Sequence, residues 1–118
     1  MSLTIFHNPR CSKSRKTLEI IEASGMTPQI IRYLDNPPEG DRIAELAALL
    51  GGPVKAIMRG GEAVVKEATD LPDLDDDRAL ADWISQHPKA LERPIVVSAD
   101  GKRAIMGRPP ENVEALLN

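Results

Sequence analysis

The run Ile95-Val96-Val97-Ser98 constrains the fold more than any other stretch of the chain. Its apolar residues follow one another without alternation, which is typical of a central strand covered on both faces. Asp100-Gly101 comes next, a pair that favours a tight hairpin turn. We therefore predict an antiparallel return strand over Arg103–Met106.

Strand and helix signals alternate through the rest of the chain. Leu3–Phe6 and Gln29–Leu34 are predicted strands, and apolar residues at helical spacing indicate the helices. The predicted helices are Ser12–Ser24 with Gly25 as its stop, Arg42–Leu50 with Asp41 as its cap, a short helix over Val54–Met58, Arg78–Gln86 capped by one of the aspartates 75 to 77, and a last helix from Pro110 or Glu111 to Leu117. The segment Ala63–Ala68 is ambiguous between helix and strand.

This order is β-α-β, then a helical insertion, then β-β-α. A four-stranded mixed sheet between two helical layers satisfies the rules for connections in such folds. We predict a thioredoxin-like three-layer α/β/α fold, with the helical insertion between the second and third strands. At 118 residues, without a linker or low-complexity segment, the chain is expected to form a single domain over residues 1–118.

Composition excludes several classes of function. The net charge of −3 disfavours a general nucleic-acid binder. No apolar stretch approaches the length of a membrane span, and no signal peptide is recognisable, so no membrane partner is expected. The single cysteine leaves no intramolecular disulfide and suits a reducing cytoplasm. A monomer is the default expectation.

The single cysteine, Cys11, lies at the predicted turn from the first strand into the first helix. Unpaired backbone N–H groups and the helix dipole favour an anion there, either the thiolate or a bound oxyanion. The alternative is a small buried hydrophobe, which the neighbours Arg10, Ser12 and Lys13 disfavour. We therefore predict a reactive thiol in a redox active site.

Two further side chains near Cys11 are candidates for catalysis. Ser14 occupies the position where dithiol oxidoreductases carry a second cysteine, so any disulfide turnover needs external thiols. Its hydroxyl either donates to the thiolate or serves the backbone at the helix start. His7 is either the cation that lowers the thiol pKa or a structural histidine.

Three arginines stand at loop corners beside Gly or Pro: Arg59, Arg93 and Arg108. Any one of them is most simply a solvated charge, but three could converge on a tetrahedral oxyanion, which suits planar bidentate donors. No metal site is predicted, because one cysteine and two distant histidines offer no zinc ligand set.

Several motifs, in order along essentially the whole chain, resemble the ArsC family of glutathione/glutaredoxin-dependent arsenate reductases, with a likeness to a short ArsC-like subgroup. They are His7-Asn8-Pro9-Arg10-Cys11-Ser12-Lys13-Ser14-Arg15, Tyr33-Leu34-Asp35-Asn36-Pro37-Pro38, Ile57-Met58-Arg59, Glu92-Arg93-Pro94-Ile95-Val96-Val97 and Gly107-Arg108-Pro109-Pro110-Glu111.

The resemblance implies the same thioredoxin-like fold and a mechanism. Cys11 would attack arsenate and form a covalent adduct, which glutathione reduces before glutaredoxin removes the glutathione. No cofactor would be bound, and glutathione would act as co-substrate. The implied roles are oxyanion binding for Arg59, Arg93 and Arg108, lowering of the thiol pKa for His7, a hydroxyl near the thiolate for Ser14, and supporting positions for Arg15 and for Pro94, whose peptide bond would be cis.

Two other functions fit the same residues. The thiol could act on another substrate, such as a glutathione mixed disulfide. Alternatively, the chain could be a non-enzymatic regulator of the Spx type, which binds RNA polymerase and senses redox through a pair of cysteines; Ser14 removes that pair.

Overall fold

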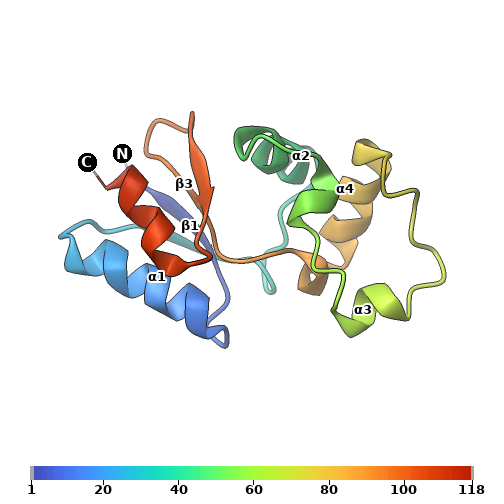
Figure 1. Ribbon diagram of the computed structural model, residues 1–118, viewed down its shortest axis with the longest axis horizontal. Coiled ribbons are helices and arrows are strands. Elements are labelled where there is room, and N and C mark those ends of the chain that lie inside the picture. The colour runs from blue at the N-terminus through green and yellow to red at the C-terminus, as the bar shows by residue number, and fades with distance from the viewer. Residues whose placement is uncertain (1, 118) are drawn as a thin grey trace. The chain divides into compact units, whose positions relative to one another are not determined.

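The computed structural model describes residues 2–117, which form two compact units (Figure 1). The sheet unit contains the residues up to Asn36 and those from Arg93 onward, and the helical unit contains Pro37–Glu92. Each unit is described by itself. The single-domain organisation therefore stays a prediction.

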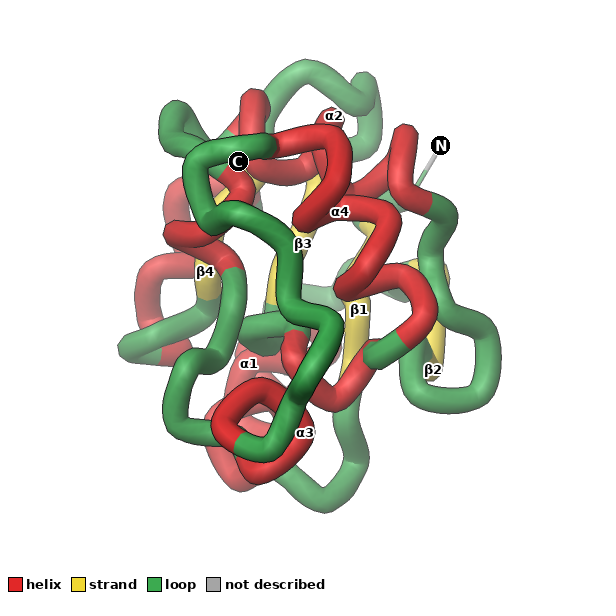
Figure 2. The backbone as a smooth tube through the Cα atoms, turned by 90° about the vertical axis from the view of Figure 1, so that its right-hand side faces the viewer, coloured by secondary structure: helices red, strands yellow, loops and turns green. Residues whose placement is uncertain are grey.

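The sheet unit contains a four-stranded mixed sheet, as predicted. Its strands are β1 (Thr4–His7), β2 (Gln29–Arg32), β3 (Ile95–Val97) and β4 (Ala104–Met106). They lie side by side in the order β2-β1-β3-β4 (Figure 2). The β1–β2 pair is parallel, whereas β1–β3 and β3–β4 are antiparallel. All three residues of β3 are buried, which confirms the prediction of a central strand.

Helix α1 (Ser12–Ala23) and the 3₁₀ helix η3 (Pro110–Leu116) pack against each other along one side of the sheet (Figure 1). The last predicted helix is thus present, but it is a 3₁₀ helix. Gly25 follows α1 with a φ of 88°, the left-handed conformation expected of its stop signal. The core between these helices and the sheet contains Leu3, Ile5, Ile21, Val96, Val113 and Leu116.

The carboxyl ends of β1 and β2 both differ from the prediction, and β1, β3 and β4 also differ by one residue at one end. Strand β1 extends to His7, because His7 pairs in register with Arg32 of β2. Strand β2 ends at Arg32, where the amide of Asp35 donates to the Arg32 carbonyl at 2.9 Å and closes a turn. Tyr33 lies in this turn and not in β2, yet its side chain is fully buried. An apolar residue at this position therefore reflects burial in the turn and not a longer strand.

The helical unit is the predicted insertion between β2 and β3. It contains α2 (Gly40–Leu49), η1 (Val54–Ile57), α3 (Ala63–Lys66), α4 (Asp77–Gln86) and η2 (Pro88–Ala90). Helices α2 and α4 pack against each other. The segment Ala63–Ala68, which the sequence left ambiguous between helix and strand, is therefore helical over Ala63–Lys66. A second helical layer on the sheet could come only from this unit, and that layer stays a prediction.

The cap predicted for α2 is wrong. The helix begins at Gly40, Glu39 is its N-cap residue without a side-chain hydrogen bond, and Asp41 lies in the first turn. The carboxylate of Asp41 instead pairs with Arg78 of α4. Gly40 lies against Asp82 of α4, so the packing of the two helices accommodates a glycine at the helix start.

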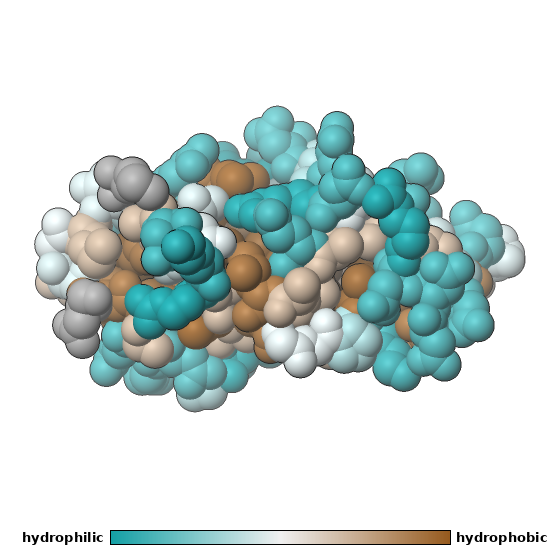
Figure 3. All heavy atoms as spheres, turned by 90° about the horizontal axis from the view of Figure 1, so that it is seen from above, coloured by the Kyte–Doolittle hydropathy of each residue, from teal (hydrophilic) through white to brown (hydrophobic). Residues whose placement is uncertain are grey.

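The space-filling view is mostly hydrophilic over the helical unit, on the right of Figure 3. Among the described residues, the large hydrophobic side chains classed as exposed are Ile30 and Leu74. Within residues 2–117, every helix is too short or too polar to cross a bilayer.

The cap of α4 gives a test of this local structure. Asp76 accepts a hydrogen bond from the Ala79 amide at 3.1 Å, so one of the three candidate aspartates is confirmed as the cap. We expect Asp76→Ala to lower the free energy of unfolding by about 1 kcal/mol, because an N–H at the helix start loses its acceptor. Urea titration measures the difference. Asp76→Asn is the matched control and should stay near wild type, since asparagine caps equally well; equal losses in both variants would contradict the assignment.

Candidate active site

The loop between β1 and α1 is shaped by Asn8, which the sequence reasoning did not single out. Asn8 is buried, and each of its polar groups except the side-chain NH₂ has a local partner. Its carbonyl accepts from the Cys11 amide at 3.0 Å, and its side-chain oxygen accepts from the Arg10 amide at 2.9 Å. Its own amide donates to Ser14 Oγ at 3.0 Å. The Asn-Pro pair after a strand was the available signal, because such pairs initiate turns.

Cys11 is the N-cap residue of α1, with an extended backbone. Its side chain is partly exposed. Burial raises the pKa of the thiol, but hydrogen bonds from the Ser14 amide, the Arg93 side chain and the Lys13 amide outweigh it, and the pKa lies below the ordinary value. The donors are the unpaired N–H groups of a helix start plus one cation. This arrangement favours the thiolate, the nucleophilic form of cysteine.

The hydroxyl of Ser14 serves the loop, and no hydrogen bond joins it to the Cys11 sulfur. Ser14 is fully buried, and its Oγ lies 2.7 Å from His7 Nδ1 while it accepts from the Asn8 amide. Ser14 contributes to the sulfur through its backbone N–H instead. The sequence left open whether this hydroxyl donates to the thiolate or serves the backbone. The structure favours the backbone role, and the amide that it serves is that of Asn8.

His7 is buried at the end of β1. Burial lowers the pKa of His7, the positive charges of Arg32 and Arg15 lower it further, and the weaker effect of Glu22 opposes them. The imidazole is therefore mainly neutral at neutral pH. Arg93 supplies a positive charge that lowers the pKa of the thiol. A contribution of His7 to the thiol pKa stays a prediction.

Arg93 and Arg108 approach the site from the two ends of the β3–β4 hairpin. Arg93 lowers the pKa of the Cys11 thiol as a hydrogen-bond donor and as a positive charge, and Arg108 Nη1 donates to the Arg93 carbonyl at 3.2 Å. The Arg93–Pro94 peptide bond is cis, which confirms what the resemblance implied. The structure thus places Arg93 where it acts on the thiol and Arg108 against the backbone of Arg93.

Gly107 holds the two ends of this hairpin together, and sequence reasoning missed its role. Its amide donates to the Pro94 carbonyl at 2.9 Å. A Cβ atom at this position would lie 2.5 Å from Thr17 Oγ1 and 2.7 Å from Pro94 Cγ. Only glycine therefore fits where the loop carrying Arg108 passes between α1 and Pro94.

Arg15, named as a supporting residue, fixes the cysteine loop from α1. Its Nη1 donates to the Pro9 carbonyl at 3.0 Å. Its charge also lowers the pKa of His7. Arg15 thus contacts the loop backbone, and none of its hydrogen bonds reaches the thiol.

Arg59 belongs to the helical unit, so its convergence on Cys11 stays a prediction. Its amide donates to the Ala90 carbonyl at 2.7 Å, beside the Met58–Leu91 bridge. Its guanidinium pairs with Glu92 at 2.9 Å and with Glu62 at 3.3 Å. The side chain is thus fixed within its own unit by two carboxylates.

Within residues 2–117, no group of three or more His, Cys, Asp and Glu side chains is placed to hold a metal ion. The described site offers a thiol whose pKa is lowered by hydrogen-bond donors and by the positive charge of Arg93.

Comparison with known proteins now decides the family. A sequence model of the ArsC family matches residues 6–116. The chain belongs to the ArsC family. It is 45% identical over 117 residues to an arsenate reductase of Neisseria meningitidis serogroup A, covering 98% of this chain and 97% of the relative. It is 41% identical to an arsenate reductase of Escherichia coli K12, covering 98% of this chain and 81% of that protein.

Solved structures agree with this ArsC assignment. An arsenate reductase from Vibrio cholerae superposes with a TM-score of 0.85 at 42% identity, covering 98% of each chain. The thioredoxin-like α/β fold predicted from the order of elements is therefore confirmed.

The bond from Arg93 to the sulfur gives a test by alkylation. We expect Arg93→Ala to raise the pKa of Cys11, because a hydrogen-bond donor and a positive charge are lost. Alkylation by iodoacetamide would then be slower than in wild type near pH 7 and equal above about pH 9.5, where both thiols are ionised. Arg93→Lys keeps the charge and should restore part of the rate. If the alkylation rates of wild type and Arg93→Ala depended on pH in the same way, Arg93 would not act on the Cys11 thiol.

The close approach at Gly107 gives a second test. We expect Gly107→Ala to lower the free energy of unfolding by about 1–3 kcal/mol, because a Cβ overlaps Thr17 and Pro94. Gly52→Ala is the matched control: its Cβ would make only ordinary contact, 3.6 Å from Ala56, so its change should be much smaller. Denaturant titration of both variants measures this, and equal effects would show that the packing at Gly107 is looser than described.

Proposed function

We propose that this ArsC protein is an arsenate reductase that forms a covalent adduct through Cys11 and uses glutathione and glutaredoxin as reductants. The observation that carries the proposal is the thiol with a lowered pKa at the start of α1, hydrogen-bonded by Arg93. The curated relatives named arsenate reductase, which are 40–45% identical over nearly the whole chain, support the choice of arsenate.

The proposed first step is attack of the Cys11 thiolate on arsenic. A sulfur–arsenic bond forms, and one arsenate oxygen leaves as water after protonation. Arg93 and Arg108 lower the charge cost of bringing an oxyanion to a thiolate, because guanidinium groups bind tetrahedral oxyanions through two parallel hydrogen bonds. Arg59 is the proposed third ligand of the oxyanion.

The proposed reduction uses two thiol equivalents from outside the chain. A glutathione thiol displaces a second oxygen as water and binds arsenic. The thiolate of glutaredoxin then attacks the glutathione sulfur, and the electron pair of the arsenic–sulfur bond stays on arsenic, which passes from As(V) to As(III). Hydrolysis of the remaining bond to Cys11 releases arsenite and restores the thiol. This external route is required because Ser14 stands where a second cysteine would be, and the chain has no second thiol.

The neutral His7 and the buried Ser14 are proposed to act by positioning. Their contact fixes the hydroxyl that holds the Asn8 amide, and Asn8 in turn holds the amide of Cys11. Arg15 and Pro94 are proposed to support the same loop and hairpin. The reaction suits a monomer in the cytoplasm, where reduced glutathione is available.

Arsenate turnover is the direct test. We expect Cys11→Ser to reduce arsenate reduction with glutathione and glutaredoxin to background, a loss of about 10³-fold or more, because serine is not ionised at neutral pH. Arsenate should also protect the wild-type thiol from alkylation. The readout is NADPH oxidation coupled through glutathione reductase.

Two outcomes would contradict the proposal. Turnover that survives Cys11→Ser would exclude the adduct. Wild-type protein that lacks arsenate turnover, but whose Cys11 is rapidly glutathionylated at neutral pH, would instead favour a glutathione mixed disulfide as the substrate.

A further inference from the structure

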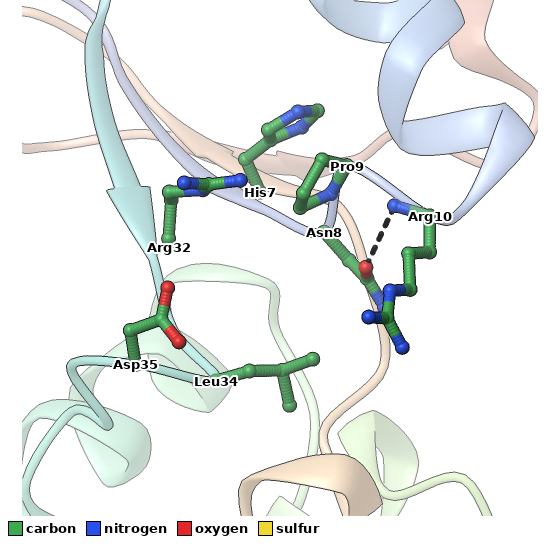
Figure 4. Close-up of a pocket in the computed structure, with 7 residues that line it drawn as sticks. All are labelled: His7, Asn8, Pro9, Arg10, Arg32, Leu34 and Asp35. Atoms are coloured by element: carbon green, nitrogen blue, oxygen red, sulfur yellow. Dashed lines mark hydrogen bonds between the residues drawn. The ribbon is translucent and has the colours of Figure 1, made fainter.

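A pocket of about 290 Å³ lies beside the cysteine loop, within the sheet unit (Figure 4). The end of β1 and the loop after it form one wall, and the end of β2 with the turn after it forms the other. The lining residues are His7, Asn8, Pro9, Arg10, Arg32, Leu34 and Asp35. Because β1 and β2 are parallel, both walls come from the carboxyl ends of strands, where α/β sheets commonly bind ligands.

The pocket holds charged groups of both signs that the rest of the site does not use. Arg10 lies on the loop wall, whereas Arg32 and Asp35 lie on the β2 wall, with the Arg32 side chain directed toward His7 (Figure 4). Within residues 2–117, no carboxylate forms an ion pair with the side chain of Arg10 or Arg32, and no cation forms one with Asp35. Leu34 adds an apolar surface between these groups.

Such a set of groups complements a zwitterion. Two guanidinium groups suit a carboxylate, a nearby aspartate suits an ammonium group, and an apolar side chain suits methylene groups between them. An inorganic oxyanion would find the arginines but would be repelled by Asp35. The pocket therefore fits the amino-acid end of a small organic molecule better than it fits arsenate.

The pocket adjoins the loop that carries Cys11. Asn8 lines the pocket, and its backbone carbonyl accepts a hydrogen bond from the Cys11 amide at 3.0 Å. A γ-glutamyl-cysteine unit is about as long as two residues, so it extends about 7 Å. A thiol peptide bound here by its amino-acid end would therefore extend out of the pocket along the cysteine loop.

We propose that this pocket binds the γ-glutamyl end of glutathione, with Arg10 and Arg32 on its α-carboxylate and Asp35 on its α-ammonium group. The inference rests on the proposed use of glutathione and assigns the residues that bind it. It separates two sites: the oxyanion lies on the Arg93 side of the loop, and the thiol peptide lies on the β2 side.

The test separates binding of the thiol from binding of arsenate. We expect Arg10→Ala/Arg32→Ala to raise the KM for glutathione about tenfold, the effect of losing charge-assisted hydrogen bonds, while the KM for arsenate changes less than twofold. The rate with 2-mercaptoethanol, which has neither a carboxylate nor an ammonium group, should be unchanged. Arg103→Ala is the matched control for loss of an exposed arginine and should leave both KM values unchanged. An unchanged KM for glutathione in the double variant would overturn the proposal.

A binding measurement keeps this test independent of arsenate turnover. S-methylglutathione keeps every charged group of glutathione but cannot react, and its dissociation constant is measured by NMR titration. We expect its binding to shift the amide signals of His7, Asn8 and Arg10 and of residues 32–35, and to weaken about tenfold in Asp35→Ala. Shifts here in a protein without arsenate turnover would uphold the subsite and refute only the arsenate substrate. Shifts confined to the surroundings of Arg93 would place glutathione elsewhere and refute the subsite.

Discussion

The hydrogen bonds that converge on the Cys11 sulfur are the constraint on which the site depends. Two come from amides of the first turn of α1 and one from Arg93. The first turn of a helix has unpaired N–H groups, so a side chain at the N-cap position faces donors at no cost to the helix. The sulfur is thereby favoured as an anion, although partial burial opposes its ionisation.

The rest of the sheet unit keeps those donors in place. Asn8 closes the loop with hydrogen bonds from its backbone and side chain. The buried Ser14 hydroxyl, which also contacts His7, accepts from the Asn8 amide. On the other side, the close packing at Gly107 holds the loop of Arg108 against Pro94 and α1. A neutral His7 is consistent with this arrangement, because a buried charge there would need a partner that Ser14 does not provide.

The arginines near the cysteine loop also act on different groups. The positive charge of Arg93 lowers the pKa of the Cys11 thiol, whereas those of Arg15 and Arg32 lower the pKa of His7. Arg59 is paired with two carboxylates in the helical unit, so an oxyanion that recruits it must compete with Glu62 and Glu92.

The sequence by itself determined the order of elements and the nature of the chemistry. Continuous β-branched residues marked β3, Asp100-Gly101 marked the hairpin, and Gly25 ended α1, because these are local conformational preferences. A single cysteine without a second thiol implied that external thiols are needed. The packing of distant segments revealed that burial lowers the pKa of His7, that the Ser14 hydroxyl accepts from the Asn8 amide and that Gly107 admits no side chain. Burial, hydrogen-bond geometry and close contact arise between segments far apart in the chain, and no local pattern encodes them.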